Sequence, residues 1–189
     1  MLISKSLLIL GHPRSGKTTL GDMICDKFGF SFISIDSLVY AFREILPELE
    51  MHHEPERSEI IFAPFLFTYM DRIKHASVYR NFVIDSCHVR PKIAEKMMDK
   101  DKYKLAVLGC PSLAPEQYVA AIRKNDKSFD WTAKQADNEL LSMAKQYIST
   151  AKQMESECAG LGIKFIDTSF DRQIKLEKFV ENLEDFLTR

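Results

Sequence analysis

The chain has 189 residues, of which 46% are hydrophobic and 28% are charged, and this balance excludes a disordered or membrane-embedded protein. A formal net charge of −1 gives no general electrostatic reason to bind nucleic acid, which favours a strongly basic face. The four cysteines show no C-x-x-C spacing, and we interpret them as reduced core thiols.

The hydrophobic segments are too short for a membrane span, which needs about 18 uninterrupted apolar residues. The first of them leads directly into a glycine-rich loop instead of a signal-peptide cleavage site, so we expect it to be a strand. We therefore expect residues 1–189 to form a single domain in the cytoplasm. We expect no nucleic-acid or membrane partner, and a monomer or a homodimer.

The hydrophobic pattern predicts strands that alternate with helices along the whole chain. A continuous apolar run at 7–10 suits a strand buried on both faces, and apolar residues recur at helical spacing over 17–28, up to Gly29. Further strands are predicted at 30–35, 82–84, 105–108 and 164–166. Further helices are predicted at 38–46, 58–74, 91–98, 115–122, 137–158 and 174–187, with an exposed loop at 48–57.

Alternating strands and helices predict a parallel sheet that is covered on both faces. In such sheets, ligands bind at the carboxyl ends of the strands. The candidates for a functional site are therefore the residues that follow each predicted strand: Gly11–Thr19, Asp36, Asp85, Cys110 and Thr168–Phe170.

Residues 11–18 read GHPRSGKT and match the pattern G-x-x-x-x-G-K-[ST], between a buried strand and a helix. The glycines of such a loop let backbone N–H groups converge on phosphate oxygens, reinforced by the positive end of the helix dipole. Lys17 is suited to the β- and γ-phosphates, and Thr18 offers a hydroxyl to Mg²⁺. The sequence therefore predicts a nucleoside-triphosphate site formed by Gly11, His12, Pro13, Arg14, Ser15, Gly16, Lys17, Thr18 and Thr19.

Two aspartates are expected to face this loop. Residues 82–85 read FVID and have the form of a Walker B strand, so Asp85 is the second candidate ligand of Mg²⁺ beside Thr18. Asp36 follows the second predicted strand, where its carboxylate could orient or deprotonate an acceptor hydroxyl. It could also be a helix N-cap, and the two roles do not exclude each other.

Together these residues resemble the P-loop kinases of small molecules and nucleotides, which include adenylate kinase-like, shikimate kinase-like and chloramphenicol phosphotransferase-like enzymes. The order of the phosphate loop, Asp36, Asp85 and a late basic segment fits that group along essentially the whole chain. The resemblance implies a three-layer α/β fold whose five-stranded parallel sheet has the order 2-3-1-4-5. It also implies ATP, Mg²⁺ and transfer of the γ-phosphoryl group to a small acceptor.

The resemblance assigns further roles. A helical acceptor-binding region is expected at about 37–75, and a lid at about 123–134, where Arg123 would neutralise transition-state charge. The loop after the fifth strand, with Thr168, is expected near the adenine base. Residues 85–91 read DSCHVRP where adenylate kinases have D-G-F-P-R, so the identity of the acceptor is undetermined. Arg90 could bind an anionic group of the acceptor.

Other functions fit the same loop. One is a non-catalytic or sensing ATP-binding module whose region 37–75 contacts a partner, and another is a toxin-like nucleotide-sugar kinase. A regulatory GTPase fits poorly, because Asp85 is not followed by glycine three residues later and 123–126 lack the order N-K-x-D. The choice between ATP and GTP is open, and 123–134 could equally be a solvated basic loop.

Overall fold

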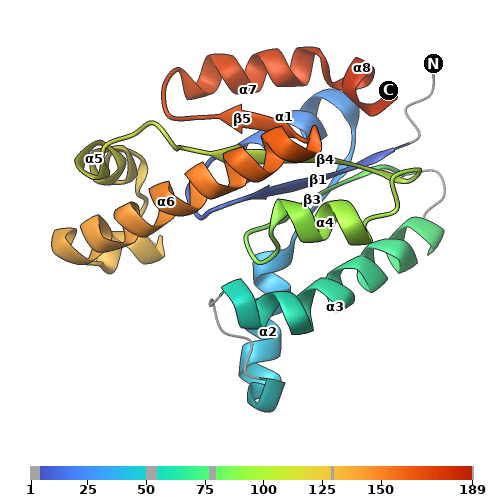
Figure 1. Cartoon of the computed structure of the whole chain (residues 1–189), viewed down its shortest axis with the longest axis horizontal. Coiled ribbons are helices and arrows are strands. Elements are labelled where there is room, and N and C mark those ends of the chain that lie inside the picture. The colour runs from blue at the N-terminus through green and yellow to red at the C-terminus, as the bar shows by residue number, and fades with distance from the viewer. Residues whose placement is uncertain (1–4, 50–54, 77–79, 129, 189) are drawn as a thin grey trace.

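The strands form one parallel sheet. The computed structural model describes residues 5–49, 55–76, 80–128 and 130–188. The strands are β1 (Ser6–Gly11), β2 (Ser31–Ser34), β3 (Phe82–Ser86), β4 (Tyr103–Gly109) and β5 (Lys164–Asp167). They pair in parallel in the order β2-β3-β1-β4-β5, which confirms the predicted fold class (Figure 1).

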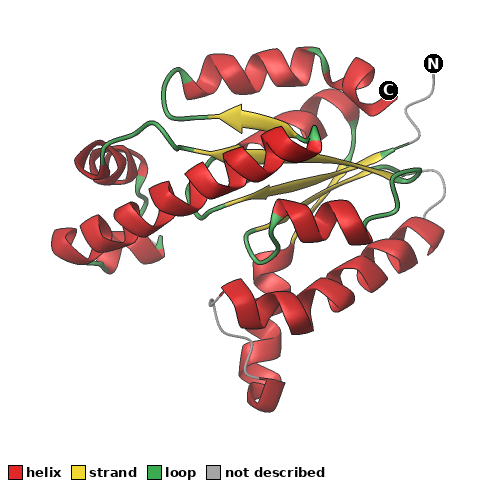
Figure 2. Cartoon of the chain, viewed as in Figure 1, coloured by secondary structure: helices red, strands yellow, loops and turns green. Residues whose placement is uncertain are grey.

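Helices lie on both sides of the sheet, as Figure 2 shows. One face is covered by α1 (Lys17–Phe28), α7 (Arg172–Glu181) and α8 (Leu183–Thr188). The other face is covered by α2 (Ile35–Ile45), α3 (Pro55–Ala76), α4 (Pro91–Met97) and the second half of α6 (Asp137–Leu161). The remaining elements are α5 (Pro115–Asn125) and the short 3-10 helices Pro47–Leu49 and Trp131–Lys134.

The core follows from the alternation of side chains along buried strands. All six residues of β1 are buried, and Leu8 and Leu10 join the cluster on the α3 face while Leu7 and Ile9 join the cluster on the α1 face. A third, smaller cluster lies between α5 and the first half of α6 and contains Cys110, Tyr118, Ile122, Leu140, Ala144 and Ile148. The α5–α6 pair therefore has a hydrophobic core of its own.

Several predicted boundaries are wrong for identifiable reasons. The second strand ends at Ser34, and α2 begins at Ile35, so Asp36 lies in a first helical turn, where the helix dipole favours a carboxylate. Helix α3 begins at Pro55 instead of Ser58, because proline is suited to a first helical position, so residues 55–57 of the expected loop at 48–57 are helical. The predicted closing helix is divided between α7 and α8.

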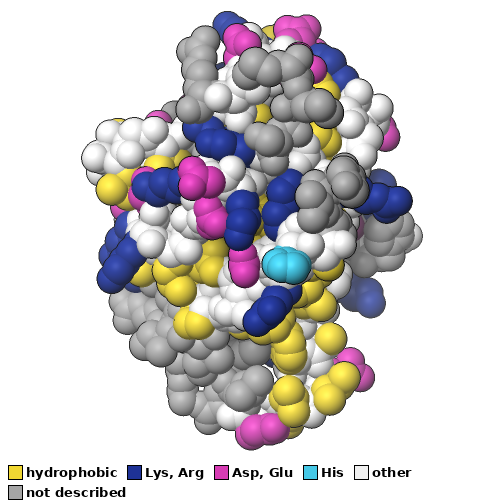
Figure 3. All heavy atoms as spheres, turned by 90° about the vertical axis from the view of Figure 1, so that its right-hand side faces the viewer, with side chains coloured by type: hydrophobic (Ala, Val, Ile, Leu, Met, Phe, Trp, Pro, Cys, Tyr) yellow, Lys and Arg dark blue, Asp and Glu magenta, His cyan; other side chains and the backbone are white. Residues whose placement is uncertain are grey.

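The surface facing the viewer in Figure 3 is the side where the strands begin, and basic and acidic side chains are intermixed on it. Lys102, just before β4, pairs with Asp71 at 2.6 Å and with Asp99 at 3.1 Å. Within the described ranges, no helix is both long and apolar enough to cross a membrane. All four cysteines are free, Cys110 and Cys158 being buried and Cys25 and Cys87 half-buried.

Candidate active site

The phosphate loop joins the carboxyl end of β1 to the first turn of α1. Gly11 and Gly16 have φ values of 155° and 101°, so each uses a backbone conformation that a side chain would strain. Gly16 precedes α1, and no side chain caps this helix end. The N–H groups of the first turn are therefore available to an anion, as the sequence predicts.

Lys17 lies at the centre of this loop. Lys17 is 6% exposed, and its Nζ donates a hydrogen bond to the carbonyl oxygen of His12 at 3.1 Å. Its positive charge reaches both candidate aspartates, because it lowers the pKa of Asp36 and opposes the rise of the Asp85 pKa that burial causes. The structure thus brings Lys17, Asp36 and Asp85 to one edge of the sheet.

The side chain of His12 is buried beside the phosphate loop. The residue is 2% exposed, its ring stacks on Tyr147 with centroids 5.8 Å apart, and its Nε2 accepts a hydrogen bond from the backbone N–H of Cys110 at 3.1 Å. Its Nδ1 lies 2.8 Å from the carbonyl oxygen of Pro13 and carries the hydrogen. Burial lowers the pKa of His12 to about 4, so the ring is neutral at physiological pH.

This neutral histidine predicts a loss of stability in mild acid. Its pKa falls from 6.5 to about 4 on folding, so between these values the unfolded state binds the extra proton. The stabilisation is fully present above pH 6.5, is lost as the pH falls toward 4, and amounts to about 3 kcal/mol. Urea unfolding at pH 7 and pH 4.5 measures it.

Matched variants identify the source of this pH dependence. His12→Gln should be less stable at pH 7 but should lose most of the pH dependence in this window, because the buried imidazole that causes it is gone. His75→Gln, at an exposed position near the end of α3, should keep the wild-type dependence. Equal unfolding free energies of the wild type at the two pH values would contradict the assignment.

Asp85 provides a candidate metal ligand. It lies within β3, beside Ile9 of β1 and Ser34 of β2, and is 2% exposed. Burial raises its pKa, and the charge of Lys17 opposes that rise. Its Oδ1 has no hydrogen-bond partner among the described residues. An unpaired buried carboxylate oxygen is costly unless a cation or its water shell meets it, so Asp85 fits the predicted Mg²⁺ role beside the exposed Thr18.

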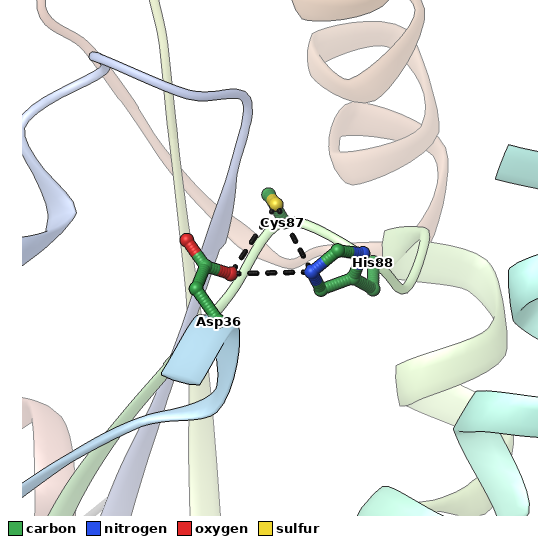
Figure 4. A group of neighbouring side chains, drawn as sticks. All are labelled: Asp36, Cys87 and His88. Carbon is green, nitrogen blue, oxygen red and sulfur yellow. Dashed lines mark hydrogen bonds and ion pairs between the residues drawn. The ribbon is translucent and has the colours of Figure 1, made fainter. Parts of the chain in front are cut away.

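Asp36 reaches the same edge from the first turn of α2. Its Oδ1 lies 3.2 Å from Nε2 of His88 and 3.4 Å from Sγ of Cys87. Figure 4 shows the three side chains converging at this point. Burial raises the pKa of Asp36, but the hydrogen bond from His88 and the charge of Lys17 outweigh it and hold the pKa below its usual value. Asp36 is therefore ionised at neutral pH.

The predicted lid segment is tied to the phosphate loop through Arg14. The guanidinium of Arg14 binds Asp126 at 2.6 Å and Asp130 at 3.0 Å. Arg14 has a φ of 64°, a strained backbone conformation, and its side chain makes both of these ion pairs. Arg123 instead holds its own segment together: its guanidinium binds Asp137 at 2.7 Å and the carbonyl oxygens of Thr132 and Gln135. Its role toward phosphate stays a prediction.

A cavity of about 480 Å³ lies between the phosphate loop and α5. Its lining includes Lys17, Thr18, Thr19, Lys127 and Arg172. Sequence analysis missed Arg172, although its place in the first turn after the β5 loop, where the predicted base site lies, is a signal that could have found it.

Thr168 is 1% exposed and lies behind the phosphate loop. Its Oγ1 is 2.9 Å from the carbonyl oxygen of Ser15 and 3.1 Å from that of Gly109. The Thr168 hydroxyl therefore links the phosphate loop to the end of β4. A direct contact between Thr168 and a nucleotide stays a prediction.

The acceptor side is partly described. Arg90 is half-buried at the N-terminus of α4, two residues after His88, and its contact with an acceptor stays a prediction. The ring of Phe62 in α3 meets the His88 ring edge-on, with centroids 5.3 Å apart, and acceptor binding by the region 37–75 stays a prediction. Residues 50–54 of that region lie outside the described residues.

Comparison with known proteins identifies the fold. No protein-family model matches the sequence, and no curated protein is significantly similar to it. A shikimate kinase from Bacteroides thetaiotaomicron superposes with a TM-score of 0.58 at 17% identity, over 98% of this chain and 99% of that chain. A gluconokinase from Sinorhizobium meliloti superposes with a TM-score of 0.51 at 14% identity, over 97% of each chain.

These similarities establish a structural class. The chain has the three-layer fold of the P-loop small-molecule kinases, with the same sheet order that the sequence resemblance implied. A shikimate kinase from Acinetobacter baumannii, solved in complex with shikimate, has the same fold, with a TM-score of 0.54 at 12% identity over 96% of this chain and 94% of that chain.

Proposed function

We propose that the chain is an ATP- and Mg²⁺-dependent phosphotransferase that transfers the γ-phosphoryl group to a hydroxyl group of a small molecule. The observation that carries this proposal is the convergence of Lys17, Asp85 and Asp36 at the edge where the phosphate loop lies. The names of the structural neighbours, shikimate kinase and gluconokinase, support a hydroxylated acceptor. A binding module would have no evident use for an ionised Asp36 beside Lys17.

The donor side would be formed by the phosphate loop and the cavity beside it. Backbone N–H groups of the loop and Nζ of Lys17 would hold the phosphates, and the cavity under α5 would hold the nucleoside. Thr18 and Asp85 would hold Mg²⁺, which neutralises charge on the β- and γ-phosphates when bound. Lys127 and Arg172 line the same cavity and would add positive charge near the phosphates.

The acceptor side would be organised by Asp36. Its carboxylate accepts the proton of the acceptor hydroxyl as that oxygen forms a bond to the γ-phosphorus. The bond between the γ-phosphorus and the bridging oxygen breaks, and its electron pair remains on the β-phosphate of ADP. The products are ADP, the phosphorylated acceptor and a proton on Asp36. Asp36 is ionised at neutral pH, which is the state that this step requires.

An acceptor screen tests the proposal. The protein is incubated with ATP and Mg²⁺ and with a panel of hydroxy acids, polyols, nucleosides, nucleotides and UDP-N-acetylglucosamine, including shikimate and gluconate. We expect mass spectrometry to show one phosphorylated acceptor that accumulates in step with ADP, and Asp36→Asn to lower its rate by about 10²-fold or more. Nucleotide binding without any phosphorylated product would instead favour a binding module. Phosphorylation of the nucleotide sugar would favour a toxin-like kinase.

A further inference from the structure

We propose that His88, assisted by Cys87, is a positioning residue for Asp36: two donors fix Oδ1 of the carboxylate and leave Oδ2 for the acceptor hydroxyl. This inference rests on the proposed function only in making Asp36 the group that meets the acceptor. The sequence suggested neither residue for this role, since Cys87 reads there as a core thiol and His88 carries no assigned task.

The geometry of the three side chains carries the proposal. Nε2 of His88 and Sγ of Cys87 lie 3.2 Å and 3.4 Å from the same oxygen, Oδ1 of Asp36. Oδ2 points away from the pair in Figure 4 and makes no hydrogen bond to any residue that the structure describes. The Asp36 side chain is 41% exposed, so the free oxygen can meet a ligand.

The two neighbours of Asp36 are suited to act as donors. The Cys87 thiol carries a hydrogen that it can donate to Oδ1, which lies 3.4 Å from Sγ. An imidazole nitrogen 3.2 Å from a carboxylate must carry a hydrogen to make a favourable contact. Both contacts stabilise the ionised form of Asp36, and so does the positive charge of Lys17. The negative charge of Asp85 opposes them.

His88 is held more firmly than the aspartate that it contacts. The residue is 6% exposed, and its backbone N–H donates to Oγ of Ser86 in β3 at 3.1 Å. The Phe62 ring of α3 packs against its imidazole at 65° to the ring plane. The sheet and α3 therefore fix the imidazole, and the imidazole fixes the orientation of a carboxylate on α2. Such support keeps a reacting group within the narrow range of useful geometry.

The same atoms invite an alternative, because a carboxylate oxygen, a sulfur and an imidazole nitrogen within 4.8 Å of one another can also hold a metal ion such as Zn²⁺. Metal binding would need Cys87 as a thiolate, directly beside the carboxylate of Asp36. It would also occupy Asp36, whose carboxylate the proposed transfer requires. The hydrogen-bonded arrangement is thus favoured, and metal binding becomes an outcome of the test.

The decisive experiment measures the pKa of Asp36 in the free protein by ¹³C NMR of the side-chain carboxyl groups, with Asp36→Asn to assign the signal. We expect a pKa below the usual value in the wild type and an increase of about one unit in His88→Leu, which removes the donor. His88→Gln, whose amide can donate, should restore much of the wild-type value. An unchanged Asp36 pKa in His88→Leu, or equal shifts in both variants, would overturn the proposal.

A cobalt titration decides between the network and the metal. We expect Co²⁺ to produce no thiolate charge-transfer band at one equivalent in the wild type. A band that is present in the wild type and absent in Cys87→Ala would overturn the proposal, because Oδ1 would then be a metal ligand. Neither this titration nor the NMR measurement needs nucleotide or acceptor, so their results stand even if the proposed phosphotransfer fails.

Kinetics separate the two proposals further. With an acceptor found by the screen, His88→Leu should lower kcat by about 10²-fold with little change in the KM for ATP, and His88→Gln should recover part of the loss. His75→Leu, an exposed change on α3, serves as the control. A wild-type kcat in His88→Leu would overturn the positioning role and leave the phosphotransferase proposal intact.

Discussion

Lys17→Ala is expected to abolish phosphoryl transfer, with a fall in kcat of about 10³-fold, while the protein still folds. Lys17 places a buried positive charge at the centre of the phosphate loop, where charge develops on the γ-phosphoryl group in the proposed reaction. Its removal also frees the carbonyl oxygen of His12 from a hydrogen bond, a loss of about 1 kcal/mol that the fold should tolerate. Steady-state rates with the acceptor from the screen, together with thermal unfolding, measure both effects.

The matched control is Lys27→Ala, because Lys27 is exposed in the last turn of the same helix, at the opposite end from the phosphate loop. It removes the same charge from α1 and should leave the rate within about twofold of wild type. More than a tenth of the wild-type rate in Lys17→Ala would contradict the assignment of Lys17.

Gly11→Ala is expected to cost at least about 3 kcal/mol of unfolding free energy, or to prevent folding. A Cβ at Gly11 would lie 2.3 Å from the carbonyl oxygen of Leu108 and 2.9 Å from Oγ of Ser15. Leu108 is fixed within β4, which is paired with β1 on one side and β5 on the other, so its backbone has no room to move. The φ of 155° at Gly11 adds strain for alanine. Urea unfolding measures the loss.

Alanine variants at two other glycines distinguish the effect of the steric clash from the effect of the backbone strain. Gly29 also has a positive φ, 69°, but a Cβ there would meet nothing within 4 Å, so Gly29→Ala should cost about 1 kcal/mol. A Cβ at Gly160, within α6, would likewise meet nothing, and Gly160→Ala should stabilise the protein by about 1 kcal/mol. If Gly11→Ala costs no more than Gly29→Ala, the steric argument at Leu108 is wrong.

The donor half of the candidate site was predictable because its information is local. The motif at 11–18 specifies a loop between a buried strand and a helix, and the predicted helix 17–28 has the observed bounds. The resemblance to P-loop kinases supplied the strand order, which neither periodicity nor composition determines. The third strand was predictable for the same reason, because an apolar run followed by a carboxylate is visible in the sequence, although β3 continues through Asp85 to Ser86.

The acceptor half and the lid depend on contacts between distant parts of the chain. Asp36 and Cys87 are 51 residues apart, and their contact requires α2 to start one residue before Asp36. Arg14 and Asp126 are 112 residues apart. A sequence shows where charged groups occur, but the fold decides which carboxylate each guanidinium meets. For this reason the sequence does not reveal that Arg123 binds Asp137 and the carbonyl oxygens of Thr132 and Gln135.

Helix α6 limits the movement that we expect of the predicted lid segment. It runs without interruption from Asp137 to Leu161, with its first half in the small core shared with α5 and its second half on the sheet (Figure 1). Near its middle, Ala151 lies so close to β4 that a Cβ added at Gly109 would be 3.1 Å from it. Both helices that flank the predicted lid segment belong to the same small core, α5 before the segment and α6 after it. We therefore expect the described residues 126–128 and 130–136 to move by local bending of this connection and not by rotation of a domain.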